Sequence, residues 1–94
     1  MEIEHKRKGN EGVFYIEEDG NRLAEMVYAD GKDNEMVILH TEVDSKLRGQ
    51  NIGYKLVHRA VEYAREHHQK IVPFCTFAKS ILERKTELQD VLKK

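Results

Sequence analysis

The middle of the chain combines a β-prone segment, a short basic loop with two glycines and a helical segment, in that order. Met36–Val43 is rich in residues that suit a buried strand, and from Ile52 onward apolar residues recur at helical spacing. The loop between them carries Arg48, whose guanidinium suits phosphate oxygens. A strand, a glycine-bearing loop and a helix N-terminus direct backbone N–H groups and the positive end of the helix dipole toward one point. The order therefore predicts an α/β unit with an anion-binding site.

Two common phosphate-binding motifs do not fit this loop. A mononucleotide P-loop ends in Gly-Lys-Ser/Thr, and the chain has no such ending. A dinucleotide fingerprint needs three glycines in register and an acidic residue about twenty positions later. Gly49 and Gly53 do not supply that register, and Lys70–Pro73 carries no acid. An anion bound by this loop is therefore expected to be of a different kind, and in a purely structural interpretation the loop is solvated and merely caps a helix.

Composition restricts the classes of function. The 94 residues predict a single domain over 1–94, and a net charge of -1 gives no reason to expect nucleic-acid binding. One cysteine excludes an internal disulfide, so we expect a reducing cytoplasm. No apolar run approaches the length of a membrane span, and Met1–His5 does not resemble a signal peptide. We therefore expect neither a membrane nor a nucleic acid as a partner.

The first half of the chain predicts four strands separated by short turns. Loops of this length connect only antiparallel neighbours. The last strand is apolar at nearly every position up to Leu39, which is typical of a central strand covered on both faces. The predicted strands are Ile3–Lys8, Val13–Ile16, Leu23–Tyr28 and Met36–Val43.

The second half predicts a long amphipathic helix over Asn51–Gln69 and a short buried strand over Ile71–Cys75. Because the helix connects this strand to Met36–Val43, the two strands should be parallel. Phe77–Arg84 and Glu87–Leu92 predict two short closing helices. The fold class is therefore α/β (α+β), a mostly antiparallel sheet with one parallel β-α-β unit and short C-terminal helices.

The spacing Arg48-x-x-Asn51-x-Gly53 resembles the acyl-CoA pyrophosphate loop of the GNAT superfamily of N-acetyltransferases, usually written Gln/Arg-x-x-Gly-x-Gly/Ala. Asn51 replaces the central glycine, and asparagine is the non-glycine residue that best tolerates a left-handed backbone. The later segment Pro73-Phe74-Cys75 resembles that of the small stand-alone N-acetyltransferase-domain branch. The predicted order of elements is also similar to the GNAT core, and the resemblance covers nearly the whole chain.

This resemblance implies an enzyme that uses acetyl-CoA as co-substrate and transfers the acetyl group directly to an amine. It also implies the residues that bind the coenzyme A: Thr41, Glu42, Val43, Arg48, Gly49, Gln50, Asn51, Ile52, Gly53 and Tyr54. Helices and strands that usually shape the acceptor site are missing from this chain. The open rim suggests a large acceptor, such as a protein lysine or N-terminus.

Two side chains are candidates for the chemistry, because ligands bind outside the carboxyl ends of parallel strands. His40 lies near the end of one such strand and Cys75 follows the other. Histidine, with an ordinary pKa of about 6.5, suits the base that deprotonates the amine. Cysteine, at about 8.5, can protonate the departing thiolate or, if activated, accept the acetyl group. Glu42 is an alternative base, acting through water. In a purely structural interpretation, His40 and Cys75 are core residues.

The remaining candidate residues concern contacts with the nucleotide and a metal site. Lys79 and Arg84 are candidates for contact with the 3′-phosphate of the nucleotide, whereas Phe77 and Ile81 are expected in the core. No metal site is expected, because the adjacent pair His67–His68 diverges by about 100° on a helix. Two functions outside catalysis stay open: a CoA-binding module, and a phosphate-binding regulatory domain unrelated to CoA.

Overall fold

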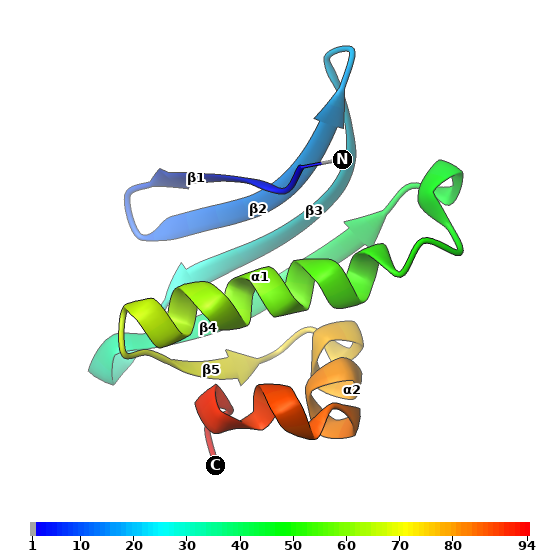
Figure 1. The fold of residues 1–94 in the computed structure, drawn as a ribbon. Coiled ribbons are helices and arrows are strands. Elements are labelled where there is room, and N and C mark those ends of the chain that lie inside the picture. The colour runs from blue at the N-terminus through cyan, green and yellow to red at the C-terminus, as the bar shows by residue number, and fades with distance from the viewer. Residues whose placement is uncertain (1) are drawn as a thin grey trace.

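The computed structural model describes residues 2–94. Met1 belongs to the predicted domain 1–94 and to the segment Met1–His5, and it lies outside the described residues. Five strands and two α-helices make up the fold (Figure 1). The strands are β1 (Glu4–Lys8), β2 (Glu11–Glu18), β3 (Asn21–Asp30), β4 (Glu35–Val43) and β5 (Lys70–Pro73). The helices are α1 (Ile52–Glu66) and α2 (Thr76–Arg84), with 3-10 helices η1 (Lys32–Asn34), η2 (Ser45–Leu47) and η3 (Thr86–Val91).

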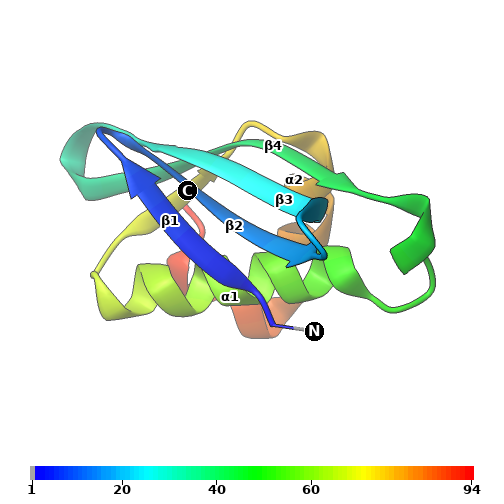
Figure 2. The same cartoon turned by 90° about the horizontal axis from the view of Figure 1, so that it is seen from above.

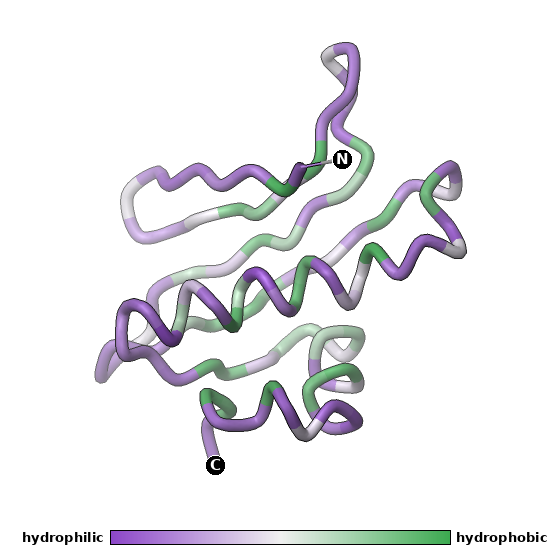
Figure 3. Tube along the Cα trace, viewed as in Figure 1, coloured by the Kyte–Doolittle hydropathy of each residue, from purple (hydrophilic) through white to green (hydrophobic). Residues whose placement is uncertain are grey.

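The sheet has the order β1-β2-β3-β4-β5, with every pair antiparallel except the parallel pair β4 and β5. The predicted fold class is confirmed. The strand β1 is hydrophilic along nearly its whole length and forms one edge, whereas apolar residues recur along β4 and β5 (Figure 3). The predicted closing helix Glu87–Leu92 is a 3-10 helix.

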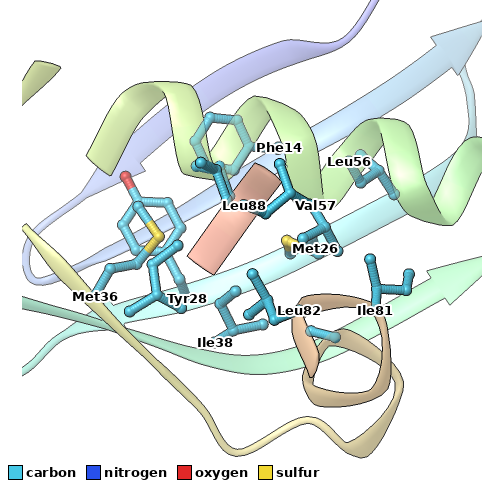
Figure 4. Packing of buried hydrophobic residues seen from close by; sticks show 14 of the residues in the cluster. Phe14, Met26, Tyr28, Met36, Ile38, Leu56, Val57, Ile81, Leu82 and Leu88 are labelled. Atoms are coloured by element: carbon cyan, nitrogen blue, oxygen red, sulfur yellow. The ribbon is translucent and has the colours of Figure 1, made fainter. Parts of the chain in front are cut away.

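The helix α1 crosses one face of the sheet (Figure 2). Its buried residues recur at helical spacing and meet the inward side chains of the strands and of α2 and η3 in a single core (Figure 4). The largest fully buried side chains of that core include Phe14, Met26, Tyr28, Met36, Ile38, Leu56 and Leu82. None of the helices in residues 2–94 is long and apolar enough to cross a membrane.

The helix α1 is shorter than the predicted Asn51–Gln69, because it ends at Glu66. His68 adopts a left-handed backbone with φ 56°. The amide of Gln69 then donates to the carbonyl of Ala64 at 2.8 Å, and the amide of His68 donates to Arg65 at 3.3 Å. These two bonds form a Schellman cap, which terminates a helix by satisfying its last carbonyls.

The strand β4 is not covered on both faces, so that prediction is wrong. Its buried apolar residues Met36 and Ile38 belong to the one core, whereas Val37 is half-buried and Leu39 is 41% exposed. The pairing with β3 also contains a bulge, since Val27 pairs with His40 but Tyr28 pairs with Ile38. Leu39 is the extra residue. The bulge shifts the alternation of side chains in the second half of β4.

The strand β5 ends earlier than predicted, at Pro73 instead of Cys75. Pairing with β4 ends at Ile38 and Pro73. The amides of Phe74 and Cys75 then both donate to the same carbonyl, that of Ile38, at 3.0 Å each. Because both bonds go to one carbonyl, the ladder goes no further along β4, and Cys75 becomes the residue that precedes α2.

Candidate active site

The loop between β4 and α1 is held by local contacts that keep its backbone in an unusual shape. The Asp44 side chain accepts a hydrogen bond from the amide of Lys46 at 2.8 Å, and Leu47 is buried. Gly49 has φ 80°, and Asn51 lies in the left-handed region at φ 60°, ψ 32°. Asn51 thus adopts the left-handed backbone conformation that asparagine was expected to tolerate. Its side chain does not cap α1, so the N–H groups of the first turn remain available to an anion.

Gly53 is required for close packing. A Cβ built at this position would lie 2.1 Å from Cζ of Phe77, in the first turn of α2. The absence of a side chain therefore lets the N-termini of α1 and α2 approach each other. Phe77, expected in the core, is 46% exposed, so that expectation is wrong.

A pocket of about 540 Å³ lies over this loop. It is lined by every predicted coenzyme-binding residue except Glu42 and Gln50. Leu47 and Lys85 also line the pocket and were not predicted from the sequence. Phe77 and Ile81, which were expected in the core, line it too, and Ile81 belongs to both the core and the pocket. The shared residues are Thr41, Val43, Arg48, Gly49, Asn51, Ile52, Gly53 and Tyr54.

The pocket is cationic on two sides. Arg48 lies in the loop, and Arg84 and Lys85 lie at the end of α2. Lys85 also lies over the ring of Tyr54, 5.5 Å from its centroid. Tyr54 donates a hydrogen bond to Glu87 at 3.2 Å, and burial together with this carboxylate raises the pKa of the phenol. The cations match the phosphates of a nucleotide.

Between β4 and β5 the backbone of β4 has a free edge beside this pocket. Thr41, Glu42 and Val43 pair with β3 on one side, but β5 has already ended at the level of Ile38. Thr41 and Val43 line the pocket. The backbone of Thr41 on this edge contacts the Cys75 thiol, and beyond it the edge of β4 is not paired with β5 and can receive an extended ligand, as in strand addition.

Cys75 lies within reach of β4, as expected, and its thiol donates to Oγ1 of Thr41 at 3.4 Å. Burial raises the pKa of the Cys75 thiol, but hydrogen bonding with Thr41 and with the amides of Ala78 and Phe77 outweighs it, so the pKa is lowered. The amides belong to the N-terminus of α2, which favours a negative charge. Cys75 is therefore a stronger acid than an ordinary cysteine.

Thr41→Val should raise the pKa of Cys75, because it removes the hydroxyl that can turn and donate to the thiolate. The pH dependence of iodoacetamide alkylation measures this, and the midpoint should move to higher pH. Thr76→Val, beside Cys75 but absent from the groups that lower its pKa, is the matched control. An unchanged midpoint in Thr41→Val would show that the hydroxyl does not stabilise the thiolate.

His40 lies on the open face of the sheet with a 51% exposed side chain, so the interpretation as a buried core histidine is wrong. Its Nε2 lies 3.6 Å from Oε2 of Glu25 and 4.0 Å from Oε1 of Glu42. Successive residues of a strand point to opposite faces, so Thr41, which contacts Cys75, faces the other way. Within residues 2–94 the expected pair, His40 and Cys75, makes no hydrogen bond. They lie on two sides of the same strand end.

Glu25, His40 and Glu42 each bring one possible metal ligand to within 4.8 Å of the others. The sequence did not predict this grouping, because Glu25 comes from a different strand. Arg22 already contacts Glu25 at 3.3 Å and neutralises part of its charge.

Comparison with protein families shows which family the sequence of this chain matches. The family model described as GCN5-related N-acetyl-transferase matches residues 13–91. The chain belongs to the GCN5-related N-acetyltransferase family. The match runs from Val13 in β2 to Val91 at the end of η3, and includes the loop, the free edge of β4 and Cys75. No curated protein matches the chain.

Solved structures of similar fold include a GCN5-like candidate N-acetyltransferase from Staphylococcus aureus, at 43% identity and TM-score 0.76. The match covers 96% of this chain and 87% of that one. A ribosomal-protein-alanine N-acetyltransferase from Brucella melitensis biovar Abortus 2308 matches at 17% identity and TM-score 0.64, over 82% of this chain and 62% of that one. A candidate streptothricin acetyltransferase from Bacillus anthracis str. Ames, solved with acetyl coenzyme A, matches at 22% identity and TM-score 0.58, over 70% of this chain and 38% of that one.

The last two likenesses concern the fold alone. Membership of the GCN5-related N-acetyltransferase family supports acetyl-CoA-dependent acetyl transfer as the general class of reaction.

Proposed function

We propose that residues 1–94 form one acetyl-CoA-binding domain that transfers an acetyl group to a primary amine. The observation that carries this proposal is the pocket over the loop, which joins uncapped N–H groups of α1 and cations of α2 to the free edge of β4. The N–H groups and Arg48 suit a pyrophosphate. The free edge suits the amide-bearing pantetheine arm, which would deliver its thioester near the end of the β4–β5 pairing.

The chemistry follows from the groups on either side of this strand end. An amide N–H of Thr41–Val43 is placed to polarise the acetyl carbonyl and stabilise the oxyanion. His40, on the open face, accepts the proton of the incoming ammonium. Cys75, on the other side, protonates the departing thiolate, because its lowered pKa makes it a better acid. We propose direct transfer because the family resemblance implies it; the lowered pKa of Cys75 also favours a thiolate, so an acetylated Cys75 is the alternative route.

The acceptor should be large, such as a lysine side chain or N-terminus of a protein. His40 is 51% exposed, and Leu39 and Phe74, two of the three exposed large apolar residues in residues 2–94, flank the end of the β4–β5 pairing. An open, partly apolar rim fits an extended surface better than a small molecule. A reducing, cytoplasmic compartment is proposed because Cys75 acts here as a free thiol.

The same exposure favours a second candidate function, a CoA-binding module without catalysis. A binder needs the pocket but has no use for His40 or the acidity of Cys75. Turnover therefore distinguishes the two functions: replacing either residue strongly lowers the rate of acetyl transfer in an enzyme while CoA affinity persists, whereas a binder has no turnover to lose.

Thermal unfolding with acetyl-CoA, CoA and ATP tests the proposed ligand. Ligand at about a hundred times its dissociation constant adds about 2.7 kcal/mol, and each kcal/mol moves the midpoint by about 4–8 °C in a domain of this size. We expect a rise of roughly 10 °C or more with both CoA forms and none with ATP. No rise with either CoA form would remove the proposed function.

The same assay with Arg48→Ala tests the loop. The CoA-induced rise should shrink, because the variant loses a charge-assisted contact to phosphate. Lys8→Ala, an exposed cation of β1 that does not line the pocket, should leave the rise intact. An undiminished rise in Arg48→Ala would contradict the assignment of the loop.

A further inference from the structure

The carboxylate of Glu25 reaches His40 from the neighbouring strand because of the bulge at Leu39. Beyond the bulge, His40 pairs with Val27, and Glu25 pairs with Glu42. All four residues therefore share the open face of the sheet, since register partners lie on the same face. The charged groups that face the imidazole are Glu25 from β3 and Glu42 from β4 itself, both nearest to Nε2.

The two carboxylates differ in how firmly they are held. Oε1 of Glu25 accepts a hydrogen bond from Arg22 at 3.3 Å, which leaves Oε2 directed at His40. Arg22 in turn lies over the ring of Tyr15, 4.3 Å from its centroid, and Tyr15 is only 3% exposed. Glu42 is 74% exposed, and its one ion-pair contact with residues 2–94 is the 4.0 Å approach to His40. The fixed carboxylate is therefore that of Glu25.

We propose that Glu25 is the positioning residue for His40: anchored by Arg22 on Tyr15, it holds the Nε2 side of the imidazole and leaves Nδ1 to take the proton of the acceptor amine. This inference rests on the proposed acetyl transfer and adds a member to its machinery. At 3.6 Å the contact lies just outside hydrogen-bond length, and a small rotation of the half-exposed histidine closes it.

Each acetyl transfer from acetyl-CoA to an ammonium group releases one proton to solvent. The acceptor ammonium gives a proton to Nδ1 of His40, and the resulting imidazolium is stabilised by the Glu25 carboxylate. The amine nitrogen then forms a bond to the acetyl carbon as the carbon–sulfur bond breaks. The thiolate of CoA takes the proton of Cys75, and the protons on His40 and from the new amide nitrogen pass to solvent, which reprotonates Cys75.

The test combines imidazole NMR with kinetics. Long-range proton–nitrogen spectra at about pH 8, where histidine is neutral, report which ring nitrogen carries the proton. His40 should be a single Nε2–H tautomer in the wild type and a mixture in Glu25→Ala. With acetyl-CoA and a lysine-containing peptide, kcat of Glu25→Ala should fall about tenfold while the acetyl-CoA Kd stays unchanged.

Two further variants separate positioning from general structure. Glu25→Gln keeps an acceptor oxygen but loses the charge, so it should restore the single tautomer and only part of kcat. Glu17→Ala removes the other carboxylate near Arg22, at 3.9 Å, and should alter neither readout. Glu25→Ala with wild-type turnover or an unchanged tautomer would overturn the assignment of Glu25 alone. A wild-type chain that acetylates no amine would overturn the proposed function, and this assignment with it.

Discussion

His40→Gln is expected to lower kcat by about 10²-fold or more, because general-base catalysis by histidine contributes typically 10²–10⁴-fold. The acetyl-CoA Kd should not change, since His40 does not line the pocket over the loop. Steady-state kinetics with the best acceptor from an amine screen measures the loss, and calorimetric titration with acetyl-CoA measures the retained affinity.

The matched control is His58→Gln. His58 is also a partly exposed histidine beside a carboxylate, with Nδ1 3.7 Å from Glu62 on α1, but it lies outside the proposed site. It should retain wild-type turnover. If His40→Gln also retained it, the base would have to be another group, with Glu42 the first to replace.

Leu56→Ala is expected to destabilise the fold by about 2–5 kcal/mol, the usual cost of truncating a buried leucine. Leu56 is fully buried on α1, one turn after Gly53, where it joins the helix to the core (Figure 4). For a domain of this size the unfolding midpoint should fall by roughly 10 °C or more.

Urea and thermal denaturation measure this loss. The neighbouring Lys55→Ala, on the exposed side of α1, should change the free energy of unfolding by no more than about 0.5 kcal/mol. A loss below about 1 kcal/mol in Leu56→Ala would mean that the core closes around the missing side chain.

The order and pairing of the elements could be predicted from the sequence because they depend on local signals. Short turns enforce antiparallel neighbours, and the helical spacing after Ile52 identifies α1. The conformation of Asn51 followed from the same kind of reasoning, since few residues accept a left-handed backbone. The family resemblance carried by Arg48–Gly53 and Pro73–Cys75 led to the family that the comparisons confirm.

What the sequence did not predict depends on contacts between distant segments. The bulge at Leu39 leaves no mark in a run of apolar residues, so the open side of β4 was missed. Glu25 and Arg22 come from β3, and only the register of the sheet brings them to His40. Phe77 was expected in the core because its apolar character is visible, whereas the missing side chain of Gly53 that accommodates its ring is a property of the packed structure.

The extra residue in β4 has a consequence for chain length. Side chains of a strand alternate strictly, and Ile38 and His40 face opposite sides as neighbouring residues would, because Leu39 has no partner on β3. Deleting Leu39 should therefore give a regular strand in which His40 stays on the open side and Thr41 on the helix side. Losing the bulge while keeping Leu39 would be far more damaging, because either His40 would be carried to the helix side and Thr41 to the open side, or Met36 and Ile38 would leave the core. Chains of this type should accept a shortening at this position but not a straightening of the strand at the same length.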